Sequence, residues 1–329
     1  MPFFVLPALY AVFAWWFSTG AILYLDGLPR RTFRWSMMAA TLISGLALYG
    51  LFASRSDTTP NGAYVAFTSG LFLWAWLEMT YYMGFVTGPR RQLCPAGCSG
   101  WRHFGHAVQS SLYHELATIG LATVIYGATR GAPNQIALWT FVVLWWVQIS
   151  AKLNVFLGVP NVSADFVPEH LAFLKSFLTK KPMNLLFPVS VTASVVLATL
   201  AAQRAMSAEA APFDAAGLAF LATLMALAVL EHWFLVVPIP IDALWRWSLT
   251  SRGTTGEAAA TAEAPSPDAA KSAGGCCHSP ARREAASPEF GLPLPHGANS
   301  LDARKRVAGL FAEADLPHPA TPSIARRQR

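Results

Sequence analysis

The sequence predicts an all-α membrane protein, a polytopic helical bundle of about seven transmembrane helices followed by a disordered tail. Of its 329 residues, 54% are hydrophobic and 13% are charged, whereas soluble globular chains carry about 25% charged residues. The apolar residues gather in runs of about 20, long enough to cross a bilayer core of about 30 Å. The chain therefore divides into a transmembrane domain at 1–249 and a tail at 250–329.

The apolar runs are separated by clear turn signals. Gly, Pro and Asn, which are typical of turns, fall at 26–29, 59–62, 88–89, 131–134 and 182. The first run has no basic segment before it and no A-x-A site after it, so we interpret it as a span and not as a signal peptide. We expect spans at 3–25, 36–53, 63–87, 111–128, 136–157, 184–203 and 215–241.

The tail has a different composition from the rest of the chain. It consists mainly of Ala, Pro, Ser, Gly and scattered charges. Such a segment buries too little apolar surface to offset the entropy of ordering it, so we expect it to be disordered.

Basic residues predict the orientation in the membrane. Loops 2, 4 and 6 contain Arg55, Arg130 and Arg204 as their only basic residues. The odd-numbered loops and the segment after the last span contain Arg30, Arg31, Arg34, Arg90, Arg91, Arg102, Lys175, Lys180, Lys181, Arg246 and Arg252. Because basic loops stay in the cytoplasm, we expect a periplasmic N-terminus and a cytoplasmic C-terminus. This distribution explains the net charge of +6 without a nucleic-acid partner.

Ionisable residues within spans are costly and commonly functional. With this orientation they fall in the cytoplasmic halves of their spans or in cytoplasmic loops, where they would form one polar site. Its predicted members are Glu78, His114, Glu115, His170, Glu231 and His232, with Lys152, Asn154 and Glu169 as supporting residues.

Three interpretations of this Glu/His site stay open. Carboxylates and imidazoles are a plausible ligand set for iron, manganese or zinc. An imidazole would also suit the magnesium of bacteriochlorophyll or a precursor. The third interpretation, which we favour slightly, is a buried hydrogen-bond network in which Lys152 pairs with a glutamate. The adjacent residues Glu231 and His232 diverge by about 100° on a helix, so they need not face the same ion.

A second, weaker candidate site lies in the third loop. Four donors there, in a C-x3-C-x4-H-x2-H pattern, are a zinc candidate: Cys94, Cys98, His103 and His106. The spacing differs from that of common zinc fingers, so we favour ordinary loop residues. On the reducing cytoplasmic side these thiols, together with Cys276 and Cys277, are expected to be free.

Six short motifs identify a family resemblance. They are TGPRR at 87–91, HEL at 114–116, SAKLN at 150–154, FLGVPN at 156–161, MNLLFP at 183–188 and LEHWFL at 230–235. The chain resembles, over residues 1 to about 249, the PuhE-type photosynthetic complex assembly proteins of purple bacteria. The resemblance implies a multi-pass protein of the cytoplasmic or intracytoplasmic membrane, encoded beside reaction-centre assembly genes.

Two functions follow as expectations. The resemblance implies a factor for assembly of the reaction-centre and light-harvesting complexes that modulates the bacteriochlorophyll level, with photosynthetic apoproteins, pigment-synthesis proteins or a lipophilic pigment as partners. The residues themselves favour a metal-dependent membrane enzyme, a di-iron-like oxidoreductase or a hydratase acting on a tetrapyrrole or carotenoid. A transporter is disfavoured because the sequence shows no internal repeat.

Overall fold

The computed structural model describes residues 2–162, 167–238 and 241–251. In these residues the regular structure is helical, apart from an isolated parallel bridge between Val159 and Lys180. The predicted disordered tail, except for its first two residues, lies outside them. The all-α expectation therefore holds for the part of the chain that the structure describes.

A helix lies at each of the seven predicted positions. The helices are α1 (Pro2–Asp26), α2 (Phe33–Ser54), α3 (Pro60–Tyr82), α4 (Gly100–Thr129), α5 (Ile136–Leu157), α6 (Leu186–Ala205) and α7 (Pro212–Phe234). Short 3₁₀ segments are η1 (Arg30–Thr32), η3 (Glu169–Phe177) and η4 (Ile241–Trp245). The largest differences from expectation are that α4 begins eleven residues earlier and α7 ends seven residues earlier.

Five of these helices are long and apolar enough to cross a membrane: Phe4–Asp26, Arg30–Ser54, Ile136–Leu157, Leu186–Ala205 and Pro212–Phe234. The expectation of seven spans is therefore not supported at α3 and α4. The first half of α4 carries Arg102, His103 and His106, which lower its hydropathy. Helix α3 includes Glu78 and several small polar residues, and it has many buried positions.

Turn chemistry explains where the helices begin. Thr59 precedes α3 and accepts a hydrogen bond from the backbone N–H of Gly62 (3.2 Å), with Pro60 at the first helical position. Asn184 precedes α6 and accepts from the N–H groups of Leu186 and Phe187. These side chains satisfy backbone donors that would otherwise be unpaired at the helix ends.

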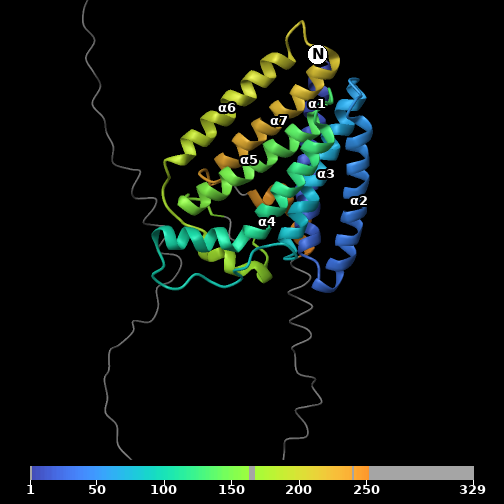
Figure 1. The fold of residues 1–329 in the computed structure, drawn as a ribbon. Coiled ribbons are helices and arrows are strands. Elements are labelled where there is room, and N and C mark those ends of the chain that lie inside the picture. Colours follow the sequence, from blue (N-terminus) through green and yellow to red (C-terminus); the bar gives the residue numbers. More distant parts are fainter. Residues whose placement is uncertain (1, 163–166, 239–240, 252–329) are drawn as a thin grey trace, which may run out of the picture. The chain divides into compact units, whose positions relative to one another are not determined.

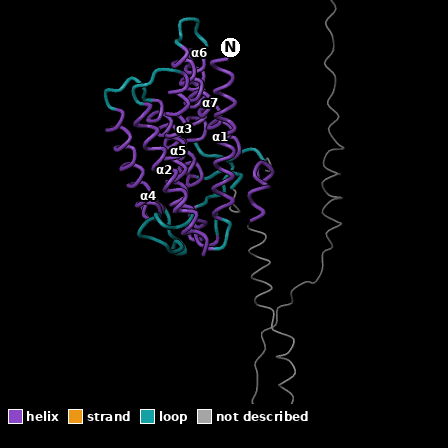
Figure 2. Tube along the Cα trace, turned by 90° about the vertical axis from the view of Figure 1, so that its right-hand side faces the viewer, coloured by secondary structure: helices purple, strands orange, loops and turns teal. Residues whose placement is uncertain are grey.

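Helix α3 lies among α1, α2, α5 and α7, while α6 packs on α7 and α4 on α5 (Figures 1 and 2). The largest buried cluster joins α1, α2, α3, α4, α5 and α7, in part through aromatic rings. Phe67 of α3 and Phe220 of α7 stack with their centroids 4.2 Å apart, and Trp74 meets Phe141 of α5 edge to face. Close packing of the central helices thus fixes where their few polar side chains lie.

The connections between successive helices alternate between two ends of the bundle. The α1–α2, α3–α4 and α5–α6 connections lie at the end away from the N-terminus (Figure 1). The segment after α7 returns to α1, because Trp245 donates its Nε1–H to the carbonyl of Trp16 (3.0 Å) and meets Trp15 edge to face. The first helix and the end of the described chain are therefore packed together.

Candidate functional site

A cavity of about 280 Å³ lies between α1, α3, α5 and α7. Most of its wall is apolar, including Trp74, Leu144 and Leu224. Its polar lining comes from all four helices and comprises Trp15, Ser18, Thr19, Glu78, Tyr82, Gln148 and Glu231. An apolar hollow with a few converging polar groups is the usual form of a small-molecule site.

Glu231 reaches the cavity from the last turn of α7. Its Oε1 accepts a hydrogen bond from the indole Nε1–H of Trp15 on α1, at 2.8 Å. The contact joins residues that are 216 positions apart in the chain. The carboxylate is thereby oriented toward the cavity by the first helix.

Glu78 lines the cavity from α3 and is buried. Gln148 of α5 donates its amide N–H to Oε1 of Glu78. The same oxygen lies 3.5 Å from Nε2 of His114, whose side chain is fully buried beside the ring of Tyr81. This carboxylate–imidazole pair is the closest approach between predicted members of the Glu/His site.

Glu115 forms a separate ion pair. Its Oε1 lies 2.9 Å from Nζ of Lys152 on α5, and Trp145 donates to its other oxygen at 3.4 Å. The pairing of Lys152 with a glutamate, predicted for a hydrogen-bond network, is therefore confirmed. Both partners of this ion pair remain partly exposed.

His232 faces away from Glu231, as the angular separation of neighbours on a helix requires. Its Nδ1 lies 2.7 Å from the carbonyl oxygen of Ala228, and its Nε2 lies 2.8 Å from Oγ of Ser150 on α5. Ser150 donates to Ser190 of α6, which also accepts from the side chain of Asn154. This buried network joins α5, α6 and α7, and both ring nitrogens of His232 have a partner in it.

The remaining predicted members lie on the α5–α6 connection. His170 is half-buried, with Nε2 2.7 Å from the carbonyl oxygen of Tyr82 at the end of α3 and its ring against Phe33. Glu169 is exposed. The predicted Glu/His set is thus distributed over several local contacts and is not gathered around one point.

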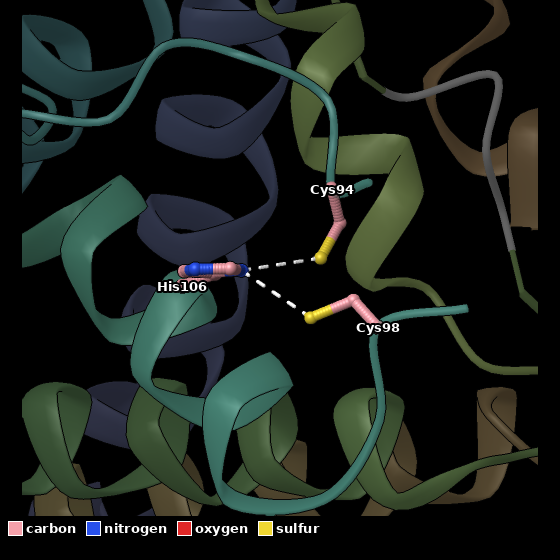
Figure 3. A group of neighbouring side chains, drawn as sticks. All are labelled: Cys94, Cys98 and His106. Atoms are coloured by element: carbon pink, nitrogen blue, oxygen red, sulfur yellow. Dashed lines mark hydrogen bonds between the residues drawn. The ribbon is translucent and has the colours of Figure 1, made fainter. Parts of the chain in front are cut away.

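The closest group of metal-ligating atoms lies in the α3–α4 connection. Cys94, Cys98 and His106 have ligand atoms within 4.8 Å of one another. In the described chain this is the one such group of three His, Cys, Asp or Glu side chains. Figure 3 shows both sulfur atoms directed at the His106 ring, and each lies 3.4 Å from Nδ1. Nδ1 of His103 lies 3.1 Å from the Cys94 sulfur. Cys94, Cys98 and His106 therefore converge, while His103 lies beside Cys94 but outside that group of three.

The local environment affects the titration of these groups. Partial burial raises the pKa of the Cys94 thiol, as do its hydrogen bond with Cys98 and the charge of that residue, while Arg90 and Arg102 act in the opposite direction. Partial burial and the same two arginines lower the pKa of His106. A lowered imidazole pKa favours the neutral form, which can offer a lone pair.

Five polar contributors to the cavity were not among the predicted site residues, namely Trp15, Ser18, Thr19, Tyr82 and Gln148. Each is a residue type found in many membrane helices or at their ends, so its type alone does not indicate a cavity. Only the packing of α1 and α5 against α3 and α7 reveals them.

The comparisons with known proteins agree in their coverage. The family model described as "Protein of unknown function (DUF3623)" matches residues 1–255. A curated relative, "Uncharacterized 30.4 kDa protein in puhA 5'region" of Rhodobacter capsulatus, is 39% identical over 251 residues, covering 75% of this chain and 91% of the relative. No solved structure matches the chain. The matched residues include the helical bundle, the cavity and the Cys/His loop.

Proposed function

The chain belongs to the DUF3623 family, and from this premise we propose that it is a membrane factor for assembling photosynthetic complexes that handles a lipophilic pigment. The observation that carries the proposal is the gene position of the relative, which is 39% identical and lies in the puhA 5' region of a photosynthetic bacterium. The resemblance to PuhE-type assembly proteins leads to the same process.

The five apolar helices make this a membrane protein, and we propose that all seven helices lie in the bacterial cytoplasmic membrane. The basic residues of the α1–α2, α3–α4 and α5–α6 connections would then face the cytoplasm, with the N-terminus in the periplasm. Gathering of these connections at one end of the bundle supports this orientation (Figure 1). Central helices such as α3 tolerate polar residues because neighbouring helices cover them.

The cavity is the part of the protein best suited to hold a pigment. Its volume of about 280 Å³ lies just below the range of roughly 300–1,000 Å³ typical of small-molecule sites. We therefore propose that only the polar edge of the pigment enters, facing Glu78, Gln148 and Glu231, while its apolar remainder lies along the helices. Both carboxylates can accept hydrogen bonds from such an edge.

Pigment handling without chemistry is favoured over the metal-dependent enzyme by the contacts of the Glu/His residues. His232 and His170 already have partners, Glu115 is paired with Lys152, and Glu231 is held by Trp15. The remaining pair, Glu78 and His114, offers two ligands to a metal. A di-iron-like centre needs several more side chains around the same point.

The experiment is complementation of a deletion strain with cavity-filling variants. Ala75 and Ala151 line the cavity, so Ala75→Phe and Ala151→Phe should reduce reaction-centre and bacteriochlorophyll content toward the level of the deletion strain. Ala39→Phe, at an exposed position of α2, is the matched control and should restore both to the wild-type level. Immunoblots of membranes must show that all three variants accumulate equally.

Full complementation by both well-expressed cavity variants would exclude the cavity as the site of action. Normal pigment and reaction-centre content in the deletion strain itself would refute the assembly role.

A further inference from the structure

We propose that the α3–α4 connection holds a zinc ion, bound by Cys94, Cys98, His103 and His106, that fixes the start of α4 to the bundle. This inference is independent of the pigment cavity and of the assembly role. Three donors, Cys94, Cys98 and His106, have ligand atoms within 4.8 Å of one another, and the fourth, His103, lies 3.1 Å from the Cys94 sulfur.

The sulfur–nitrogen distances in the loop are close to those between the ligands of a tetrahedral zinc ion. Zn–S bonds of about 2.3 Å and Zn–N bonds of about 2.0–2.1 Å place sulfur and nitrogen ligands about 3.6 Å apart. Here the Cys94 sulfur lies 3.1 Å from Nδ1 of His103 and 3.4 Å from Nδ1 of His106. The Cys98 sulfur also lies 3.4 Å from Nδ1 of His106. Small outward movements of Cys94, Cys98 and His106, with a shift of the His103 ring toward the other two ligands, would accommodate the ion.

The local backbone is shaped to bring the two thiols together. Cys98 donates its backbone N–H to the carbonyl of Pro95 at 3.1 Å, which closes a turn between the cysteines. Gly97 and Gly100 have φ of 75° and 62°, values that L side chains rarely adopt. The chain then enters α4, which presents His103 and His106 three positions apart and hence on one face.

Contacts outside the four donors hold the site in place. The ring of His103 stacks on Phe156 of α5, with centroids 5.2 Å apart, and contacts Phe177 of η3. The backbone N–H of Cys94 donates to Oγ of Ser176 in η3, at 3.2 Å. Such outer contacts orient metal ligands in known sites. Through them the ion would connect α4 with α5 and with the α5–α6 connection.

The ligand chemistry selects zinc. Two thiolates and two imidazoles in a tetrahedral arrangement are typical of structural zinc sites. Both cysteines are free of disulfides, and in the proposed orientation they face the reducing cytoplasm.

The first test is elemental analysis of the full-length protein purified in mild detergent, with and without Cys94→Ser/Cys98→Ser. The matched control is Cys276→Ser/Cys277→Ser, which removes the other two cysteines of the chain. The wild type and the control should each retain close to one zinc per chain, and Cys94→Ser/Cys98→Ser should retain almost none. Loss of zinc from Cys276→Ser/Cys277→Ser, with zinc retained in Cys94→Ser/Cys98→Ser, would overturn the proposal.

A second measurement covers the case in which the double variant does not fold. Zinc in the wild type is exchanged for Co²⁺, which should give tetrahedral d–d bands and a thiolate charge-transfer band. His106→Cys should keep the metal and raise the charge-transfer intensity about 1.5-fold, because three thiolates replace two. A weak octahedral Co²⁺ spectrum without thiolate charge transfer in the wild type would contradict the site.

Discussion

Trp15 on the first helix donates its indole N–H to the carboxylate of Glu231 on the last, at 2.8 Å. The contact closes one side of the cavity and joins α1 to α7. It also gives the half-buried carboxylate of Glu231 a hydrogen-bond donor among apolar neighbours. Glu231 is thus held at the wall of the cavity by its hydrogen bond with Trp15.

Removing this donor should destabilise the bundle modestly. Hydrogen bonds between membrane helices contribute about 0.6–1.7 kcal/mol by double-mutant cycles, so Trp15→Phe should lower the free energy of unfolding by about that amount. Glu231→Gln keeps an acceptor for Trp15 and should cost less than Glu231→Ala. Thermal unfolding in detergent measures the relative stabilities of these variants. Equal losses for the Gln and Ala variants would show that the contact is not stabilising.

Glu78→Gln separates pigment handling from metal-dependent chemistry. The glutamine retains an oxygen that can accept the hydrogen bond from Gln148, so complementation of a deletion strain should remain near the wild-type level. A metal-dependent enzyme would instead lose function while the protein still inserted, because an amide is a poor substitute for a ligating carboxylate. Accumulation of a pigment intermediate in the Glu78→Gln strain would establish the enzyme interpretation.

Gly70 permits the close approach of α3 and α5. A Cβ atom at this position would lie 2.6 Å from the carbonyl oxygen of Ala137, whereas a Cβ at Gly45 of α2 would meet nothing within 4 Å. Gly70→Ala should therefore cost about 1–3 kcal/mol through overpacking. Gly45→Ala, the matched control, should be neutral or stabilise by up to about 1 kcal/mol. Thermal unfolding of the two variants in one detergent tests this contrast.

Zinc binding at the Cys/His loop should strengthen as the pH rises. The ion displaces protons from thiols, and the raised pKa of Cys94 keeps that thiol protonated over a wider pH range. Apparent affinity should fall as the pH is lowered, as measured by competition with a chromophoric chelator. Arg102→Ala should weaken binding at neutral pH, because the arginine lowers the pKa of Cys94. An affinity independent of pH would exclude thiolate ligands.

The positions of the helices could be predicted from the sequence, because apolar run length and Gly/Pro turns are local signals. Asn134 illustrates this, since its side chain lies in a predicted turn and donates to the carbonyls of Ser54 and Gly62. The start of α4 was misplaced because its first eleven residues are polar enough to resemble a loop. Hydropathy alone does not distinguish an amphipathic helix from a connection.

The candidate site was less predictable. The sequence predicted that Glu231 and His232 diverge on their helix, but not that α7 directs one toward Trp15 and the other toward Ser150. Which helix each residue faces depends on long-range packing, which no local pattern encodes. The proximity of the donors in the Cys/His loop was also not predictable from the sequence. Its spacing matched no common finger, while the turn at Pro95 and the first turn of α4 bring its donors together.

The most direct test of pigment handling is an absorption spectrum of the protein purified in mild detergent from its native photosynthetic membrane. The wild type and Ala39→Phe should carry a bacteriochlorophyll or precursor band in near-stoichiometric amount, and Ala75→Phe should have lost most of it. A pigment-free wild type, or a band unchanged by filling the cavity, would contradict the account.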